Sequence, residues 1–381
     1  PGAVVHAPPK PADQFARHHI NPATSSPLSH RADPSLGQPG GRFHPEVSPG
    51  LSAPARPPPA PARPRPGPAR RTTPARRAAN DAPPPAMLTH ASHTPSRILI
   101  IRPSALGDVC RSVPVLAALR SAFPAASIDW LVQDTFAPAI ASHPALTRVV
   151  PFVRSRVGKV HMAAGRAELR ALLGTLRSAA YDVVLDCQGL ARSGVLTRIT
   201  GAPLRVGHAD ARELAFLAYS RRVPHAPGTS EHTVDRMLEL LAPLGIDPPA
   251  DPDMRLHLPA SLDHWPTRTL GLAPGQRYAL LAPTSRWPGK RWPADRFAEV
   301  ARRLLDSPLG LAAIAFVGTA DEQPQIAPML ELSQRDPRVI NLAGKTSIAQ
   351  LMALVRDASL VIANDSAAVH MAVGFNRPMV A

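Results

Sequence analysis

The chain has 381 residues, of which 44% are hydrophobic, so it is long enough for two packed domains, each with its own core. No apolar run approaches the length that spans a bilayer, which argues against a transmembrane protein. The net charge of +15 favours an anionic partner, but only 4% of the residues are aromatic and none are interleaved with the basic runs. Nucleic-acid binding is therefore a weak alternative and is not expected.

Residues 1–96 differ in composition from the rest of the chain. They hold 23 of the 47 prolines and nearly half of the excess positive charge, in runs such as 54-PARPPPAPARPRPGPARR-71, and they contain almost no Ile or Val. Such a segment cannot bury enough apolar surface to offset its ordering entropy. We expect residues 1–96 to be a disordered Pro/Arg-rich tail, with Met87 as a candidate natural start.

After this tail, short apolar runs alternate with helical patterns. The expected strands of the first series are 97–102, 127–132, 148–152 and 182–187. The expected helices are 108–122, 164–178 and 229–245, the last of which ends near Gly245. The following stretch, 246–276, is rich in Pro, Asp and Gly and has no clear period, so we expect it to contain the link between two domains.

A second alternating series follows the link. Its expected strands are 278–283, 311–318, 338–344, 359–365 and the start of one at 378–381. Its expected helices are one opened by Pro293, then 320–334, 347–358 and 366–375. Near-continuous apolar strands separated by helices predict parallel sheets that are covered on both faces. The chain is therefore expected to be an α/β protein with two doubly wound domains, 97–265 and 266–381, facing a cleft.

The turn after the first strand of each series lacks the G-x-G-x-x-G signature of dinucleotide-binding folds, which argues against a Rossmann-type oxidoreductase. Ligands of doubly wound sheets still bind at the carboxyl ends of the strands. Asp108 in S-A-L-G-D lies at such an end. It could cap a helix by satisfying free N–H groups, or it could be a general base, with Gly107 allowing a substrate to approach closely.

The stretch 283-PTSRWPGKRWP-293 follows the first strand of the second series. Thr284 and Ser285 supply hydroxyl donors, and Lys290 supplies a mobile ammonium. This combination is typical of a diphosphate clamp, which needs a cation for charge and donors for orientation. A solvated basic loop is the alternative interpretation.

Two further strand ends carry candidate ligand-binding residues. In 363-ANDSAAVH-370 the free N–H groups that begin at Ser366 predict an anion site, while Asp365 could be a helix cap. In 317-VGTADE-322, Glu322 could accept hydrogen bonds from ribose hydroxyls or could be an ordinary acid at the start of a helix.

Basic and amide side chains follow two strands of the first series. Gln188 and Arg192 come after the strand 182–187, and Arg154 and Arg156 lie in a basic loop after the strand 148–152. All four could hold an anionic acceptor, although a solvated charge run is the simpler interpretation of the two arginines in the loop. The two cysteines are expected to be reduced thiols in a cytoplasmic protein.

The motifs, taken in order, resemble those of glycosyltransferase family 9. They are S-A-L-G-D at 104–108, D-C-Q-G-L at 186–190, T-S-R-W-P-G-K-R-W-P at 284–293, N-L-A-G-K-T-S at 341–347 and N-D-S at 364–366. The resemblance covers 97–381, and the ordered set is far more specific than any one motif. The family comprises the ADP-heptose:lipopolysaccharide heptosyltransferases, and the D-x-Q-G-L segment is most similar to the heptosyltransferase I type, which adds heptose directly to Kdo.

The resemblance implies a GT-B fold, made of two Rossmann-like domains, in which the first binds mainly the acceptor and the second mainly the nucleotide sugar. It implies an inverting transfer of heptose from ADP-heptose to the Kdo-bearing inner core of lipid A, without a metal or other cofactor. The implied roles are Asp108 as base, Thr284, Ser285 and Lys290 at the donor phosphates, Glu322 at the ribose, and Asp365 with Ser366 at the pyrophosphate. An anionic, lipid-linked acceptor implies a cytoplasmic enzyme that contacts the cytoplasmic face of the inner membrane.

Two features depart from the family pattern. Ala367 stands where the family commonly has glycine, and the chain stops at Ala381 inside an expected strand, so a further loop and a closing helix are expected beyond it. Two alternatives remain open besides the nucleic-acid binder: a family 9 enzyme with another nucleotide sugar or acceptor, and the nucleotide-binding oxidoreductase.

Overall fold

The structure, a computed structural model, describes residues 94–159, 161–225 and 232–381, all of which fall within the unit Pro83–Ala381. The tail predicted at 1–96, with Met87, lies outside the described residues apart from 94–96. The described residues form two parallel sheets with their helices, which we call the first lobe and the second lobe. The domain limits 97–265 and 266–381 stay predictions, and the second of them begins one residue into the helix α7 (Trp265–Thr269).

The first lobe is built on six parallel strands in the order β3-β2-β1-β4-β5-β6. Their bounds are β1 Arg97–Ile101, β2 Ser127–Gln133, β3 Arg148–Phe152, β4 Val183–Asp186, β5 Leu204–His208 and β6 Arg221–Val223. This is the order of a doubly wound dinucleotide-binding sheet. Ile98 and Ile100 face one side and Leu99 and Ile101 the other, and all four are fully buried, which is why the first strand has no polar alternation.

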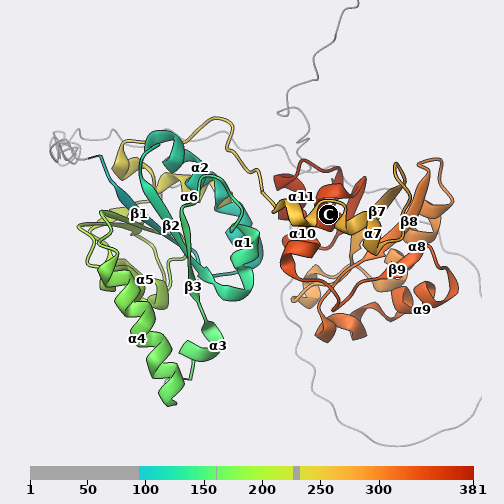
Figure 1. Ribbon diagram of the computed structural model, residues 1–381, viewed down its shortest axis with the longest axis horizontal. Coiled ribbons are helices and arrows are strands. Elements are labelled where there is room, and N and C mark those ends of the chain that lie inside the picture. Colours follow the sequence, from blue (N-terminus) through green and yellow to red (C-terminus); the bar gives the residue numbers. More distant parts are fainter. Residues whose placement is uncertain (1–93, 160, 226–231) are drawn as a thin grey trace, which may run out of the picture. The chain divides into compact units, whose positions relative to one another are not determined.

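Helices cover both faces of this sheet (Figure 1). One face packs on α1 Leu106–Arg111, α2 Val113–Ala122 and α6 Thr233–Glu239, and the other packs on α4 Ala163–Ser178 and α5 Ala191–Ile199. The short α3 Arg154–Val157 lies between β3 and α4 in the chain. The 3-10 helices of this lobe are η2 Asp134–Ala139, η3 Ala215–Ala218 and η4 Ala242–Leu244.

The second lobe repeats the same winding with five parallel strands in the order β11-β10-β7-β8-β9. Their bounds are β7 Arg277–Ala282, β8 Leu311–Phe316, β9 Val339–Asn341, β10 Leu360–Ala363 and β11 Met379–Val380. One face packs on α8 Ala294–Leu305 and α9 Ala327–Arg335, and the other packs on α10 Ile348–Asp357 and α11 Ala367–Gly374. The remaining 3-10 helices are η5 Ala260–Leu262, η6 Pro288–Lys290 and η7 Ala320–Ile326.

The structure corrects several of the expected elements. The helix expected at 108–122 is two helices, because the chain ends α1 at Ser112 and begins α2 with Pro114 in its first turn. The helix expected at 320–334 begins as the 3-10 helix η7, with Pro324 inside it. The link 246–276 contains η5 and α7, and the residues 229–231 of another expected helix lie outside the described ranges. The helix α5 and the strands β5 and β6 were not predicted.

Candidate functional site

Both sheets reverse their winding beside their first strand. β1 lies between β2 and β4, and β7 lies between β8 and β10. In doubly wound sheets the ligand binds outside the carboxyl ends of the strands at such a switch point. Candidate residues follow the two central strands and one neighbour of each. They are Asp108 after β1, Gln188 after β4, Thr284 and Ser285 after β7, and Asp365 with Ser366 after β10. The candidate residues therefore gather at the two switch points.

Asp108 is the third residue of α1, and two arginines hold its carboxylate. Arg102, the residue after β1, donates from its Nη2 to Oδ2 at 2.7 Å, and Arg111, one turn further along α1, pairs with Oδ1. Arg102 is buried, and its Nη1 also donates to the carbonyl of Cys187 after β4. The carboxylate also accepts a long hydrogen bond of 3.4 Å from the Ala105 N–H, so it caps the helix as well as pairing with cations.

These contacts decide the protonation state of Asp108. Burial by itself raises the pKa of the carboxyl group, but the charges of Arg102 and Arg111 and the hydrogen bond from Arg111 outweigh it, so the pKa lies below its ordinary value. Asp108 is therefore ionised at neutral pH, which is the form that a proton acceptor needs. Arg102 and Arg111 were not among the expected site residues, because spacing alone does not show which arginine meets which acid.

The loop after β4 is fixed by a buried carboxylate. Asp186 accepts hydrogen bonds from the N–H groups of Gln188 at 2.9 Å and Gly189 at 3.0 Å, and from the hydroxyl of Tyr219 at 2.7 Å. The Gln188 side chain in turn accepts from the Ser104 N–H at 3.1 Å. Burial raises the pKa of Asp186, against the effect of these hydrogen bonds. The D-C-Q-G-L motif thus builds a rigid loop that braces the Asp108 loop across the switch point.

An unpredicted amide has the same bracing role in the second lobe. Asn364, directly after β10, is buried; its Nδ2 donates to the Pro283 carbonyl at 2.6 Å and its Oδ1 accepts from the Trp292 N–H at 2.9 Å. Arg291 donates to the Ser285 carbonyl at 2.7 Å. The loop 283–293 is therefore tied to the end of β10 and to itself, although residues 286–292 are exposed, so a diphosphate clamp and a solvated basic loop both stay open as interpretations.

Lys290 and Asp365 are brought together at the second switch point. Lys290 Nζ lies 2.5 Å from Asp365 Oδ2, and both side chains are about half exposed, at 50% and 59%. The hydrogen bond from Lys290, together with its charge, lowers the pKa of Asp365. Asp365 is not the cap of α11, since the cap position belongs to Ser366.

Ser366 leaves polar groups unused at the start of α11. Its side chain makes no capping hydrogen bond, and its Oγ is buried with no hydrogen-bond partner among the described residues. The N–H groups of the first turn of a helix have no partner within the helix and carry its positive end. The start of α11, beside the Lys290 ammonium, is therefore suited to an anion.

Thr284 and Ser285 are buried directly after β7, and the Ser285 N–H donates to Gln325 at a long 3.4 Å. A side chain on Gly318 would meet Thr284 Cγ2 at 2.8 Å and Glu322 Oε2 at 3.6 Å, so the loops after β7 and β8 approach each other at this glycine. Glu322 itself accepts from the Thr319 N–H at 2.9 Å as part of a capping box. Its place near Thr284 agrees with the expected donor side, while its role at a ribose stays a prediction.

Within the unit Pro83–Ala381, α1 packs against α11. A side chain on Gly107 would lie 2.7 Å from His370 Cδ2, so it would have to displace the His370 ring at the contact between the two helices. Burial and the charge of Arg111 lower the pKa of His370, which is neutral at pH 7. The space that we expected Gly107 to leave for a substrate is occupied by His370 in this structure.

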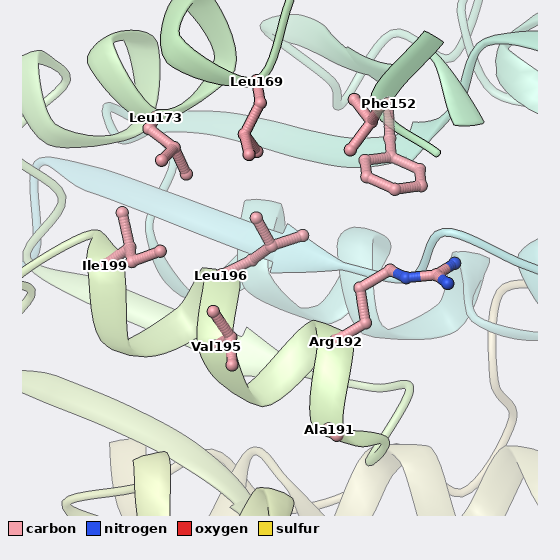
Figure 2. Close-up of a pocket in the computed structure, with 9 residues that line it drawn as sticks. Phe152, Leu169, Leu173, Ala191, Arg192, Val195, Leu196 and Ile199 are labelled. Atoms are coloured by element: carbon pink, nitrogen blue, oxygen red, sulfur yellow. The ribbon is translucent and has the colours of Figure 1, made fainter. Parts of the chain in front are cut away.

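The remaining candidates belong to α3 and to the first turn of α5. The Arg192 guanidinium lies 5.7 Å from the centre of the Phe152 ring, at one end of an apolar groove (Figure 2). Arg154 and Arg156 are exposed on α3, where Arg156 pairs with Glu168 at 3.3 Å. Arg192 lines the groove, and Arg154 and Arg156 lie on the short helix that precedes α4.

Within the described ranges, no group of three or more His, Cys, Asp or Glu side chains is placed to hold a metal ion, and no helix is both long and apolar enough to cross a bilayer. The metal-free reaction stays a prediction. Cys110 and Cys187 are free thiols, and burial raises the pKa of each to about 12, so both are unreactive.

Comparisons with known proteins show the family of the chain. A family model described as glycosyltransferase family 9 (heptosyltransferase) matches residues 169–381. Lipopolysaccharide heptosyltransferase 1 of Pseudomonas aeruginosa is 31% identical over 292 residues, which cover 74% of this chain and 77% of the relative. Lipopolysaccharide heptosyltransferase 1 of Escherichia coli K12 is 29% identical over 287 residues, which cover 74% of this chain and 86% of the relative.

Solved structures give the same result. The E. coli heptosyltransferase WaaC with ADP-2-deoxy-2-fluoro heptose superposes with a TM-score of 0.61 at 28% identity, covering 74% of this chain and 87% of that one. E. coli ADP-heptose lipopolysaccharide heptosyltransferase II superposes with a TM-score of 0.60 at 22% identity, covering 74% and 83%, which supports the fold. The chain therefore belongs to glycosyltransferase family 9 and is a heptosyltransferase with the GT-B fold.

Proposed function

We propose that the protein acts in lipopolysaccharide core biosynthesis, where it transfers heptose from ADP-heptose to the Kdo of the lipid A inner core with inversion at the anomeric carbon. Asp108 is the general base of this proposal. Two comparisons support it: the relatives that match most of the chain are named lipopolysaccharide heptosyltransferase 1, and a similar structure holds ADP-2-deoxy-2-fluoro heptose.

In the proposed reaction, an acceptor hydroxyl oxygen attacks the anomeric carbon as the bond from that carbon to the phosphate oxygen of ADP breaks. The hydroxyl proton passes to Asp108, and the electron pair of the broken bond leaves with ADP. Arg102 and Arg111 keep Asp108 ionised and oriented, but their charges also weaken it as a base. Of the two, Arg111 is the more exposed, so an acceptor that draws it away from Asp108 would strengthen the base.

On the donor side, the leaving diphosphate gains negative charge during the reaction. Lys290, the Ser366 hydroxyl and the first N–H groups of α11 would meet this charge, and Thr284 and Ser285 would orient the phosphates. A carboxylate repels a diphosphate, so we assign Asp365 the task of holding Lys290 in place. Glu322 would accept from the ribose. This charge balance requires no metal ion and no other cofactor.

On the acceptor side, Kdo and lipid A carry carboxylate and phosphate groups. Gln188, close to the Asp108 loop through Ser104, would orient the reacting sugar, while Arg192, Arg154 and Arg156 would neutralise the anionic lipid. Because the acceptor is anchored in a membrane, the proposed enzyme works in the cytoplasm, in peripheral contact with the cytoplasmic face of the inner membrane.

One observation carries this proposal. The ionised Asp108 follows the central strand of the first lobe, and Lys290, beside the free N–H groups at the start of α11, follows the central strand of the second. The two lobes contact each other through α1 and α11. The test is to mix the protein with ADP-heptose and an acyl-free Kdo acceptor, then to follow ADP release and the anomeric configuration of the product by NMR. Transfer with inversion is expected. Transfer from UDP- or GDP-linked sugars in preference to ADP-heptose would instead favour the alternative of another family 9 donor.

A further inference from the structure

An apolar groove in the first lobe lies outside the proposed reaction centre. It runs between α4 and α5 and has a volume of about 500 Å³. Figure 2 shows Leu169 and Leu173 of α4 on one side and Leu196 and Ile199 of α5 on the other, with Arg192 at one end. A groove of this size falls in the range of small-ligand sites, and its walls suit a hydrocarbon chain.

A second hollow, of about 310 Å³, continues the apolar surface around α5 towards η3. Ala191 and Val195 line both hollows, so the two are neighbours on one surface. Val195, Leu214 and Leu217 are 57%, 66% and 63% exposed. We call these three residues, with the two hollows, the α5–η3 face. Contiguous exposed apolar side chains of this kind mark a contact with a membrane or another protein.

The charges around the α5–η3 face favour an anionic membrane. Residues 154–222 contain twelve Lys and Arg but only five Asp and Glu. Arg192 and Arg198 line the two hollows, and the one acid that lines them, Glu213, is engaged with the Ala191 N–H at 3.1 Å. Apolar side chains that protrude among arginines are typical of surfaces that lie on anionic lipid, whereas the centre of a protein interface is usually depleted of charge.

We propose that the α5–η3 face lies on an anionic bilayer surface and that the groove between α4 and α5 takes up one lipid acyl chain. This inference deepens the proposed function and rests on it only for the lipid nature of the acceptor. Arg192 lies four residues after Gln188, which contacts the loop of Asp108 through Ser104. The charged end of the groove is therefore at the edge of the sheet where the acceptor sugar is expected to react.

The position of the membrane can be read with a fluorescent label. Both native cysteines are buried, so a cysteine introduced by Leu217→Cys can be labelled selectively with an environment-sensitive dye. Leu309→Cys is the matched control, since Leu309 is an exposed leucine, at 46%, of the second lobe. The dye at position 217 should shift to the blue on phosphatidylglycerol vesicles but not on phosphatidylcholine vesicles, and the dye at 309 should not shift. Equal shifts at the two positions, or none at 217, would overturn the proposal.

A second experiment tests whether the exposed leucines of this face hold the protein on the membrane. The variant combines Leu217→Ser with Leu214→Asn, because Leu214 has φ of 62° and asparagine tolerates that left-handed conformation. Loss of two exposed leucines should weaken partition onto phosphatidylglycerol vesicles about tenfold. Transfer to an acyl-free acceptor should be unchanged.

Partition equal to that of the unaltered protein would contradict the assignment of this face. If the unaltered protein transferred heptose to neither an acyl-free nor an acylated acceptor, the proposed function would fail. The dye shift at position 217 would still decide whether the face lies on the membrane.

Discussion

The loops at the two switch points hold their charged residues in different ways. In the first lobe, the Asp108 carboxylate is three-quarters buried and forms ion pairs with Arg102 and Arg111. Arg102 also donates a hydrogen bond to the loop after β4. In the second lobe, Lys290 and Asp365 form a single exposed pair. A buried ionic network is costly to break, whereas an exposed pair contributes about 0–1 kcal/mol and is easily exchanged for another partner.

This difference indicates that the two lobes have different tasks in the reaction. The first lobe presents a carboxylate whose position is set before substrates arrive, as a base that must meet one hydroxyl requires. The second lobe keeps an ammonium that can leave Asp365 for a diphosphate at little cost. Substitutions in the first region should therefore affect the chemical step and the folding free energy, and those in the second region should affect mainly donor affinity.

The largest effect is expected from Asp108→Asn. Asparagine keeps the shape of the side chain but cannot take up the proton, so the transfer rate should fall by about 10²–10⁴-fold. Affinity for ADP-heptose, measured by calorimetry, should stay within about twofold. Asp210→Asn, which removes an exposed acid paired with Arg236 in the same lobe, is the control and should transfer normally. A comparable loss in that control would point to a general charge effect instead.

The same variant gives a pH-dependent stability difference. The pKa of Asp108 is lowered in the folded state, so its ion pairs stabilise the fold above the ordinary value of 3.8, and this contribution is lost as pH falls through the lowered pKa. At pH 7, Asp108→Asn should therefore reduce the free energy of unfolding by about 2 kcal/mol. Urea unfolding near pH 3 should show a smaller difference, and a constant difference at both pH values would contradict the assignment.

Arg102→Met tests the difference between a buried and an exposed ion pair, because it removes the cationic partner of Asp108. It removes the buried partner of Asp108 and of the Cys187 carbonyl, so the free energy of unfolding should fall by about 3 kcal/mol. Arg303→Met, which breaks an exposed pair with Glu299, should cost less than about 1 kcal/mol. Denaturant unfolding of both variants provides the measurement, and equal losses would mean that Arg102 is not a buried structural cation.

Asn364→Ala should lower the stability of the second lobe without removing a charged side chain. The Pro283 carbonyl and the Trp292 N–H lose their partner, which should cost about 2 kcal/mol of stability. The loop 283–293 would lose its tie to β10, so KM for the donor should rise more than kcat falls. A variant in which only kcat changes would place Asn364 in the chemical step rather than in loop positioning.

Lys290→Met should weaken ADP-heptose binding by about tenfold, because one charge-assisted contact to phosphate is lost. The melting temperature should hardly change, since the pair with Asp365 is exposed. Lys345→Met is the matched control: Lys345 is an exposed lysine of the same lobe, bonded to the Asn341 carbonyl. Calorimetry with ADP-heptose separates them, and equal affinities for both variants would remove Lys290 from the donor site.

The smallest effect on the fold is expected from Glu322→Gln. Glutamine can still accept from the Thr319 N–H, so stability should change by less than about 1 kcal/mol. If Glu322 also accepts from the ribose, affinity for ADP should fall a few-fold while affinity for pyrophosphate should not. Unchanged affinity for ADP would leave Glu322 as a helix cap only.

The sequence predicted the parts of the site that follow directly from a strand end. Asp108 and Lys290 come after apolar runs that form central strands, and carboxyl ends of parallel strands are where doubly wound folds bind ligands. The family motifs added their expected roles. Two doubly wound lobes and the GT-B fold were confirmed, because β-branched strands and helical periods alternate through most of the chain.

What could not be predicted depends on contacts between distant segments. Arg102 looks like an ordinary residue after a strand, and only the fold places it between Asp108 and the Cys187 carbonyl. Asn364 belongs to a motif, yet its bonds run to Pro283 and Trp292, which are 81 and 72 residues away in the chain. The strand β5, with the sequence LRVGH, has too little apolar content to stand out, and its role comes from pairing with β4.

The contrast between the two regions can be tested in one measurement: the single-turnover transfer rate to an acyl-free Kdo acceptor as ADP-heptose is raised to saturation. Lys290→Met should regain most of its rate, because the missing ammonium mainly reduces occupancy of the donor site, and should keep only a small deficit from the charge it no longer meets on the leaving diphosphate. Asp108→Asn should stay slow at every donor concentration. The proposed mechanism has a fixed base in the first lobe and a separate, exchangeable donor clamp in the second. It would be contradicted if Asp108→Asn recovered at high donor concentration and reached a saturated rate equal to that of the unaltered protein.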